Sequence, residues 1–232
     1  MQVEVFNDAA AVARAAAQFI AESARVAIAE RGQFVLAVSG GKTPWIMLRE
    51  LAKEQLAWEN VRIAQVDERI APAGHADRNL THLGESLLAT VALRPAQVLA
   101  MPVEDTDLPA AARHYEERLA SVAGSPPVLD LVHLGMGPDG HTASLLPGDP
   151  ALDISDAGVA LTGEYQGRRR MTLTYPPINR ARQILWLVTG ADKAPMLPRL
   201  LDRDPSIPAG RVEQARALLL ADSAAAAEME KP

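Results

Sequence analysis

Short, uninterrupted apolar runs alternate with longer amphipathic stretches along this chain, and this alternation limits its possible folds more than any other feature. A run of five or six apolar residues is too short for a helix and is typical of a strand buried on both faces. We predict strands at residues 34–38, 61–66, 129–134, 171–174 and 184–188. Helical spacing of apolar residues predicts helices at 7–31, 43–55, 79–92 and 108–120. The alternation predicts a doubly wound α/β fold, Rossmann-like and three-layered, with a mostly parallel sheet flanked by helices.

The C-terminal third carries two weaker signals. Tyr175-Pro176-Pro177 interrupts the chain, and a short helix is expected to begin at residues 178–181. The Ala-rich tail at 215–229 is predicted to be a helix packed on the sheet, because apolar residues from Val212 to Leu219 form a stripe. No linker, charge run or composition shift divides the chain, so we expect one domain over residues 1–232.

Composition excludes several classes of function. The chain has no cysteine, which removes disulfides, thiol nucleophiles, zinc fingers and iron–sulfur clusters. Its net charge is −6 and only 4% of its residues are aromatic, which argues against a nucleic-acid surface. No run approaches about 18 apolar residues, and the first residues lack the pattern of a signal peptide. We expect a cytoplasmic monomer with no nucleic-acid or membrane partner.

The turn after the first predicted strand is a candidate phosphate cradle. Ligands of such sheets bind at the carboxyl ends of the strands. Here the chain reads Ser39-Gly40-Gly41-Lys42-Thr43-Pro44, with Thr43 expected to cap the next helix. Glycines and a helix N-terminus let backbone N–H groups approach an anion, although a simple capped turn explains the same residues. A nucleotide P-loop is excluded, because that motif needs a glycine where Leu36 stands.

Three charged residues, Asp67-Glu68-Arg69, follow the second predicted strand. Arg69 has the geometry to bind a substrate anion through two hydrogen bonds, and Asp67 to accept a proton or orient a hydroxyl. A structural ion pair explains these three residues equally well. His75 and His82 lie in the polar stretch that follows and are expected to be surface residues.

A glycine-rich turn follows the third predicted strand, at residues 135–144. It contains G-x-G-x-x-G, but Asp139 inside the turn would repel a pyrophosphate, so a nicotinamide site is disfavoured. His141 stands at the start of an expected helix, two residues after Asp139. A helix N-terminus favours the neutral imidazole, the form that takes a proton from water. His141 is therefore the predicted general base.

Basic residues later in the chain complete the candidate anion pocket. Arg168, Arg169 and Arg170 enter a predicted strand, and a solvated basic run is the ordinary explanation for at least two of them. Lys193, after the strand at 184–188, is the stronger single candidate. No H-E-x-x-H pair and no G-x-S-x-G elbow is present, so no metal site and no serine esterase is expected.

Taken together, these motifs resemble the 6-phosphogluconolactonase family over nearly the whole chain. The resemblance rests on SGGKTP at 39–44, DER at 67–69 with Asn79 downstream, GMGPDGHTASLLPG at 135–148, RMTLT at 170–174 and TGADK at 189–193. It implies a cofactor-free hydrolase that converts 6-phosphogluconolactone to 6-phosphogluconate in the pentose phosphate pathway.

The mechanism expected from this placement uses His141 as general base on a water that attacks the lactone carbonyl. Asp139 orients or tunes the base, and Arg69 or a backbone N–H stabilises the oxyanion. Whether Asp67 touches the substrate is left open. The expected phosphate and substrate contacts come from the turn after the first predicted strand, from one arginine of the 168–170 run and from the lysine after the last predicted strand. These residues are Ser39, Gly40, Gly41, Lys42, Thr43, Arg170 and Lys193.

Two other functions compete with this one. Glucosamine-6-phosphate deaminases resemble DGH-x-A-x-N-E-P in the central motif, whereas this chain has Leu146 in place of the acid. The deaminase proton relay would then be incomplete. A non-catalytic sugar-phosphate sensor would keep the cradle and do no chemistry, but His141 and Asp139 beside the cradle argue against it.

Overall fold

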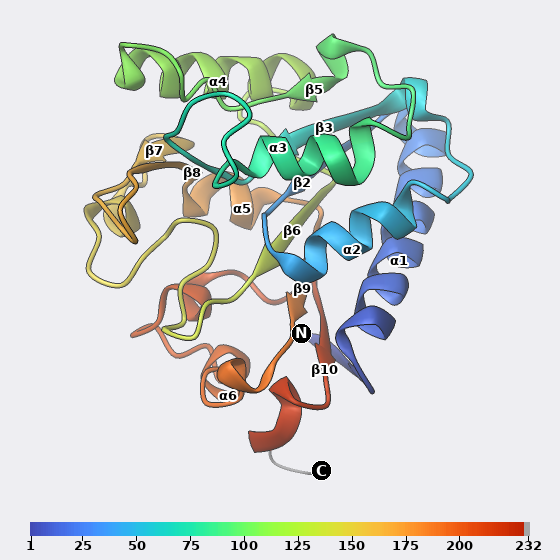
Figure 1. Ribbon diagram of the computed structural model, residues 1–232, viewed down its shortest axis with the longest axis vertical. Helices are drawn as coiled ribbons and strands as arrows, with labels where there is room; N and C mark the ends of the chain where they lie inside the picture. Colours follow the sequence, from blue (N-terminus) through green and yellow to red (C-terminus); the bar gives the residue numbers. More distant parts are fainter. Residues whose placement is uncertain (230–232) are drawn as a thin grey trace.

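The computed structural model describes residues 1–229 as a central parallel sheet with helices on both faces and a small second sheet beside it (Figure 1). The central sheet has the spatial order β1-β10-β9-β6-β2-β3-β5, and every neighbouring pair is parallel. Its strands are β1 (Gln2–Phe6), β2 (Phe34–Val38), β3 (Val61–Gln65), β5 (Val98–Leu99), β6 (Leu131–Gly135), β9 (Gln183–Val188) and β10 (Ala217–Asp222). The doubly wound α/β prediction is therefore confirmed.

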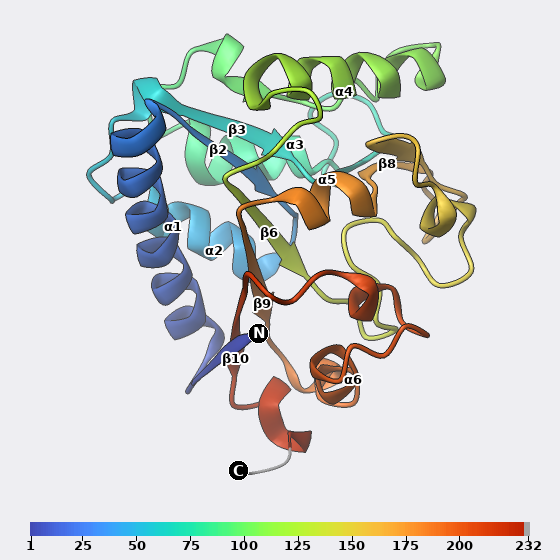
Figure 2. The same ribbon diagram turned by 180° about the vertical axis from the view of Figure 1, so that it is seen from behind.

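Helices cover the two faces of this sheet as two separate groups. The helices are α1 (Ala9–Arg31), α2 (Lys42–Leu51), α3 (Asn79–Leu83), α4 (Leu108–Ala123), α5 (Tyr175–Arg180) and α6 (Leu197–Leu201). The first three pack on one face, and α4, α5 and α6 on the other, which is seen best from behind (Figure 2). No helix in residues 1–229 is long and apolar enough to cross a membrane.

The strands supply both cores because their side chains alternate between the faces. In β2, Val35 and Ala37 join the core under α4 to α6, whereas Phe34, Leu36 and Val38 join the core under α1 to α3. All five residues are buried. This is why the strand has no polar position, and why an uninterrupted apolar run identified it in the sequence.

The second sheet was not predicted. Its antiparallel strands β4 (Asp67–Arg69), β8 (Arg170–Leu173) and β7 (Val159–Leu161) pack in the order β4-β8-β7. Two of the three strands have only three residues, and β4 consists entirely of charged residues. Such strands lack the apolar pattern from which strands are predicted. The predicted strand at 171–174 therefore exists, but in this sheet and not in the central one.

The predicted C-terminal helix is wrong. Residues Ala217–Asp222 form β10, which is wholly buried between β1 and β9. The Ala217-Leu218-Leu219-Leu220-Ala221 run carries the same uninterrupted apolar signal as β2, and the alanines around it obscured that signal. Only a 3-10 turn at Ala225–Glu228 follows within the described part of the tail.

The four longer predicted helices begin within two residues of the predicted starts, whereas α2 ends at Leu51 instead of 55 and the short helix α5 begins at Tyr175, before the expected 178. Asp8 caps α1 through a hydrogen bond from the Ala11 N–H, and Gly32 ends it in a left-handed conformation. The helix predicted at 79–92 is shorter and changes into a π-helix at Gly84–Leu88. Further 3-10 turns lie at Trp58–Asn60, Pro95–Gln97, Pro150–Asp153, Ala191–Lys193 and Pro208–Arg211.

Candidate active site

A cleft of about 660 Å³ opens at the carboxyl ends of β2 and β6. From β2 the chain builds the sheet outward through β3 and β5, whereas β6, β9 and β10 lie on the other side. Ligands of open α/β sheets bind at such a switch point. All the predicted site residues except Asp139 line the cleft, namely Ser39, Gly40, Gly41, Lys42, Thr43, Asp67, Arg69, His141, Arg170 and Lys193.

Asp139 lies directly behind His141. Its Oδ1 is 2.6 Å from His141 Nδ1 and also accepts the His141 backbone N–H at 3.2 Å. A carboxylate only accepts hydrogen bonds, so Nδ1 carries a hydrogen, and the neutral form of this imidazole has its lone pair on Nε2. Burial raises the pKa of the Asp139 carboxyl, but the charge and hydrogen bonds of His141 outweigh burial and lower that pKa overall. The pair has the arrangement of a general base with its orienting acid.

A glycine is required behind this pair. A Cβ at Gly137 would overlap the His141 ring and crowd Asp139 Oδ1. The Gly137 N–H also donates to the His141 carbonyl oxygen at 2.8 Å, which closes the turn. Gly137 therefore lets the imidazole approach the backbone of the turn.

The helix expected to begin at His141 does not form. The chain instead makes a tight turn in which the Leu145 N–H donates to the Thr142 carbonyl oxygen, and Ala143 has a φ of 52°. The argument that a helix N-terminus keeps His141 neutral is thus wrong. The Asp139 contact is what orients the imidazole.

The glycine loop after β2 does lead into a helix, with one correction. Gly41, at a φ of 139°, is the N-cap of α2, and Thr43 lies inside the helix. The Thr43 hydroxyl is 2.7 Å from that of Thr189, so it ties the loop to the end of β9. A Cβ at Gly40 would overlap the Asn79 carboxamide, which explains a glycine at that position. Lys42 is exposed at the rim.

A buried histidine supports the start of this loop. His133 in β6 accepts the Ser39 backbone N–H on Nδ1 at 3.2 Å, and the Ser39 hydroxyl donates to the His133 carbonyl oxygen at 3.0 Å. Burial lowers the pKa of His133 to about 3. The imidazole is therefore a neutral structural acceptor, and no local pattern of residues around His133 indicates this role.

Two arginines from the small sheet face the cleft side by side. Arg69 of β4 and Arg170 of β8 are paired in the antiparallel register. Within residues 1–229, the Nε atoms of both side chains are buried without a hydrogen-bond partner. Burial, together with the charge of Arg69, lowers the pKa of Arg170. Two neighbouring guanidinium groups, each with a buried and unused Nε donor, favour an anionic ligand.

The other two arginines of the 168–170 run do not line the cleft. Arg168 donates from Nε to Asp77 Oδ2 at 2.9 Å, and Arg169 is exposed. His75 and His82, expected at the surface, are both partly exposed.

Asp67 is buried and held on both carboxylate oxygens. Ser144 Oγ donates to its Oδ2 at 2.7 Å, and the Asn79 carboxamide donates to its Oδ1 at 3.3 Å and to its carbonyl oxygen at 2.9 Å. Arg170 in turn donates to Ser144 Oγ at 3.4 Å. Asp67 is thus a fixed acceptor at the cleft wall.

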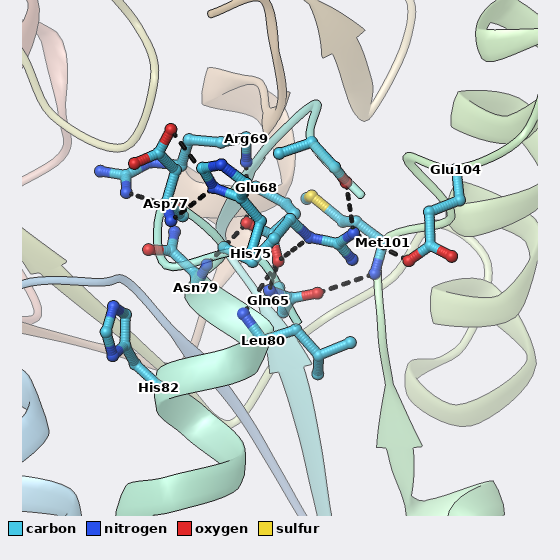
Figure 3. Close-up of polar contacts among 12 residues, drawn as sticks. Gln65, Glu68, Arg69, His75, Asp77, Asn79, Leu80, His82, Met101 and Glu104 are labelled. Atoms are coloured by element: carbon cyan, nitrogen blue, oxygen red, sulfur yellow. Dashed lines mark hydrogen bonds and ion pairs between the residues drawn. The ribbon is translucent and has the colours of Figure 1, made fainter. Parts of the chain in front are cut away.

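Glu68 is the centre of the network behind that wall (Figure 3). It is completely buried and forms an ion pair with Arg78 at 3.1 Å. Its two oxygens accept four further hydrogen bonds of 2.7 to 2.9 Å, from the backbone N–H groups of Arg69, Asn79 and Leu80 and from the Gln65 side chain. A structural ion pair, left open by the sequence, is therefore present, but through Glu68 and Arg78.

Lys193 lies at the opposite rim in the 3-10 turn after β9. Its ammonium group is 2.7 Å from Asp192 Oδ2, and both residues line the cleft. The cleft therefore brings an acidic side chain to its basic rim, next to the predicted lysine.

Sequence reasoning missed Tyr165 and Ser144. Tyr165 lines the cleft, and its hydroxyl donates to Asp139 Oδ2 at 3.3 Å. No spacing rule connects Tyr165 with a residue 26 positions earlier. The contact of Ser144 with Asp67 spans 77 positions and depends on how the second sheet packs.

A doubly wound α/β protein with a histidine–aspartate pair, a glycine loop and two neighbouring arginines in one cleft defines a class that binds and acts on small anionic molecules. Similarity to known proteins defines the class more narrowly. Residues 7–220 match the family model described as glucosamine-6-phosphate isomerases/6-phosphogluconolactonase. The chain belongs to this family.

Relatives with curated names agree with this assignment. Proteins named 6-phosphogluconolactonase are similar to the chain at 34% identity in Nostoc sp. and 36% in Mycobacterium tuberculosis, each match covering 98% of both chains. A solved structure, the 6-phosphogluconolactonase from Trypanosoma cruzi, matches with a TM-score of 0.88 and 25% identity, and covers 99% of this chain and 97% of its own.

Proposed function

We propose that this protein hydrolyses 6-phospho-D-glucono-1,5-lactone to 6-phosphogluconate, in the oxidative pentose phosphate pathway. The observation that carries the proposal is the His141–Asp139 pair, at 2.6 Å, in the same cleft as the glycine loop and the arginines Arg69 and Arg170. The chain's family and its relatives named 6-phosphogluconolactonase support it.

In the proposed mechanism His141 Nε2 takes a proton from a water as the water oxygen bonds to the lactone carbonyl carbon. The resulting oxyanion is stabilised by Arg69 or a backbone N–H. The bond between the carbonyl carbon and the ring oxygen then breaks, and the proton on His141 passes to that oxygen. Asp139 keeps the imidazole oriented throughout and stabilises its protonated form.

The phosphate group binds at the glycine loop in this proposal. Backbone N–H groups of Gly40, Gly41, Lys42 and Thr43 and the side chains of Arg170 and Lys193 hold it. Ser39 contributes by fixing the start of the loop, because its N–H and its hydroxyl both donate to His133. Asp67 is already engaged by Ser144 and Asn79, so it orients a substrate hydroxyl and does not act as a base. The binding energy of the remote phosphate positions the reacting carbonyl.

The test is hydrolysis of freshly made lactone, coupled to a dehydrogenase that consumes the product, with the spontaneous rate subtracted. His141→Asn should lower kcat by about 10²- to 10⁴-fold and leave KM nearly unchanged. His114→Asn is the matched control, because His114 is exposed on α4 and lies outside the cleft. The reaction contains a chelator, since the proposal requires neither metal nor cofactor.

A wild-type rate equal to the spontaneous rate would contradict the proposal. Turnover of glucosamine-6-phosphate would then test the deaminase alternative, and binding of a sugar phosphate without turnover would test the sensor alternative. The deaminase alternative has little support, because Leu146 is buried where the deaminase motif has its acid.

We also propose that the enzyme is a single-domain monomer of the cytoplasm. In residues 1–229 the exposed large hydrophobic side chains are Val5 and Val26, which are isolated valines and not a contiguous patch. Light scattering of the purified protein tests the oligomeric state.

A further inference from the structure

We propose that Tyr165 is a positioning residue that couples the His141–Asp139 pair to Arg170, its hydroxyl holding Asp139 and its ring holding Arg170. The inference rests on the proposed function and extends it to a residue that the sequence motifs do not contain. Tyr165 lies between the end of β7 and the start of β8, within the segment 162–169.

A tight hairpin fixes the position of Tyr165. The backbones of Tyr165 and Arg168 exchange two hydrogen bonds, of 3.0 and 3.2 Å, and the Thr162 N–H donates to the Arg170 carbonyl oxygen. Gln166 and Gly167 at the tip have φ values of 52° and 75°. Two left-handed residues match the twist of a two-residue hairpin, so the tip is a defined turn.

A second anchor ties the outside of this hairpin to the 70–78 loop. Arg168 Nε donates to Asp77 Oδ2 at 2.9 Å, and Arg168 also contacts His75 Nε2 at 3.3 Å. The carbonyl oxygen of Asp77 accepts a hydrogen bond from Arg69 at 2.9 Å. The hairpin and the loop therefore orient both cleft arginines, Arg69 through Asp77 and Arg170 through Tyr165.

The hydroxyl of Tyr165 completes the hydrogen bonding of Asp139. Asp139 Oδ1 is used by His141, and Oδ2 accepts the Tyr165 hydroxyl at 3.3 Å. Burial and the charge of Asp139 raise the pKa of Tyr165, so the phenol remains a donor. With both oxygens engaged, the carboxylate cannot rotate freely and holds the imidazole in one orientation.

The ring of Tyr165 contacts the side chains of both Arg170 and His141. The Arg170 guanidinium carbon lies 5.0 Å from the ring centroid, and the His141 ring meets it edge-on with centroids 5.7 Å apart. A guanidinium over an aromatic face is attracted by the ring quadrupole. This contact holds Arg170 where its Nε has no other partner in the described chain.

The two functions of the side chain are separable by substitution. Tyr165→Phe removes only the donor to Asp139, and it should lower kcat about threefold to tenfold with KM unchanged. Asp139 without this donor stabilises protonated His141 more strongly, so the acidic limb of the kcat–pH profile moves to higher pH. Tyr165→Leu also removes the ring, so it should raise KM about tenfold and weaken binding of inorganic phosphate similarly.

The Tyr165 variants leave every charged side chain around His141 and Asp139 in place. Apart from Asp139 and Tyr165, the titratable residues that line the cleft with His141 are Lys42, Asp67, Arg69, Arg170, Asp192, Lys193 and Asp222. Tyr175→Phe is the matched control: its hydroxyl donates to the Pro208 carbonyl oxygen, and Tyr175 does not line the cleft. It should leave kcat, KM and the pH profile unchanged.

The imidazole of His141 is also followed by NMR against pH, because this readout does not require turnover. A His141 titration midpoint that moves to higher pH in Tyr165→Phe, but not in Tyr175→Phe, supports the proposal. An unmoved midpoint with unchanged kcat overturns the role of the hydroxyl, and unchanged KM in Tyr165→Leu overturns the role of the ring. A wild-type protein without lactonase activity contradicts the proposed function instead, whatever the midpoint does.

Discussion

The two sheets contribute to the cleft in different ways. The central sheet supplies loops that start where its strands end, the glycine loop after β2 and the 135–141 turn after β6. The small sheet supplies side chains directly from its strands, Asp67 and Arg69 from β4 and Arg170 from β8.

The supports behind these two walls differ as well. The 39–43 loop is held by the buried His133 at its start and by the contact between the Thr43 and Thr189 hydroxyls at its end. The side chains of the small sheet are held by a continuous network that runs through Glu68, Asn79, Asp67 and Ser144. We conclude that changes behind the small sheet act mainly on folding stability, whereas changes at the loops act on pH dependence and substrate affinity.

The strongest test of this comparison is Glu68→Ala. The substitution leaves four donors and the buried Arg78 guanidinium without their acceptor. Breaking a buried ion pair in this way costs about 3–5 kcal/mol of unfolding free energy. Urea denaturation measures the loss.

Glu104→Ala is the matched control for Glu68. Glu104 pairs with the same Arg78 at 2.8 Å, but its side chain is 53% exposed, so its loss should cost less than about 1 kcal/mol. Equal effects of the two variants would mean that the network behind the small sheet adds no special stability.

For the central sheet, the corresponding test is His133→Asn, read as a function of pH. In the folded protein burial holds the pKa of His133 at about 3, against an ordinary value of 6.5 in the unfolded chain. Only the unfolded chain binds the proton between these values, so stability is lost as pH falls from about 6.5 toward 3. Between pH 7.5 and 5 this group should cost the wild type about 2 kcal/mol.

The asparagine variant should lack this part of the pH dependence. Its carboxamide oxygen replaces Nδ1 as the acceptor for the Ser39 N–H and does not titrate. Thermal or urea unfolding at the two pH values measures the difference, and His114→Asn, at an exposed position, should leave the wild-type slope. If His133→Asn also keeps that slope, the support assigned to the glycine loop is wrong.

The difference between the sheets also explains what the sequence could predict. Every predicted strand of the central sheet is present, because parallel strands covered on both faces need uninterrupted apolar runs. The strand β4 is a run of three charged residues whose conformation depends on pairing with β8, about a hundred positions later in the sequence. Nothing local in Asp67-Glu68-Arg69 specifies that partner. β10 was missed for another reason, since its alanine-rich surroundings favoured a helix in the prediction.

The residues of the site could also be predicted only in part. Its loop residues could be predicted because glycines, a histidine and a lysine directly follow apolar runs. The residues that position them could not. His133 looks like part of an apolar strand, Ser144 like a residue of an expected helix, and Tyr165 lies in a hairpin whose first strand was not predicted. Each depends on a contact between segments far apart in the chain.

The smallest expected effect comes from the loop wall, in Asp192→Asn. Asp192 is exposed and engages the Lys193 ammonium group at 2.7 Å, while its negative charge lines a cleft proposed to hold a phosphate. Neutralising it should lower KM about twofold to fivefold, the range of a surface ion pair, and leave kcat and unfolding free energy unchanged. Asp156→Asn, which removes the same charge from an exposed site outside the cleft lining, should leave KM as it is. Because the charge effect is screened by salt, the gain in affinity should shrink as ionic strength rises. A gain that is the same at all salt concentrations would show that Asp192 acts through the shape of the turn. It would then give no support to an electrostatic role of Lys193 in binding the phosphate.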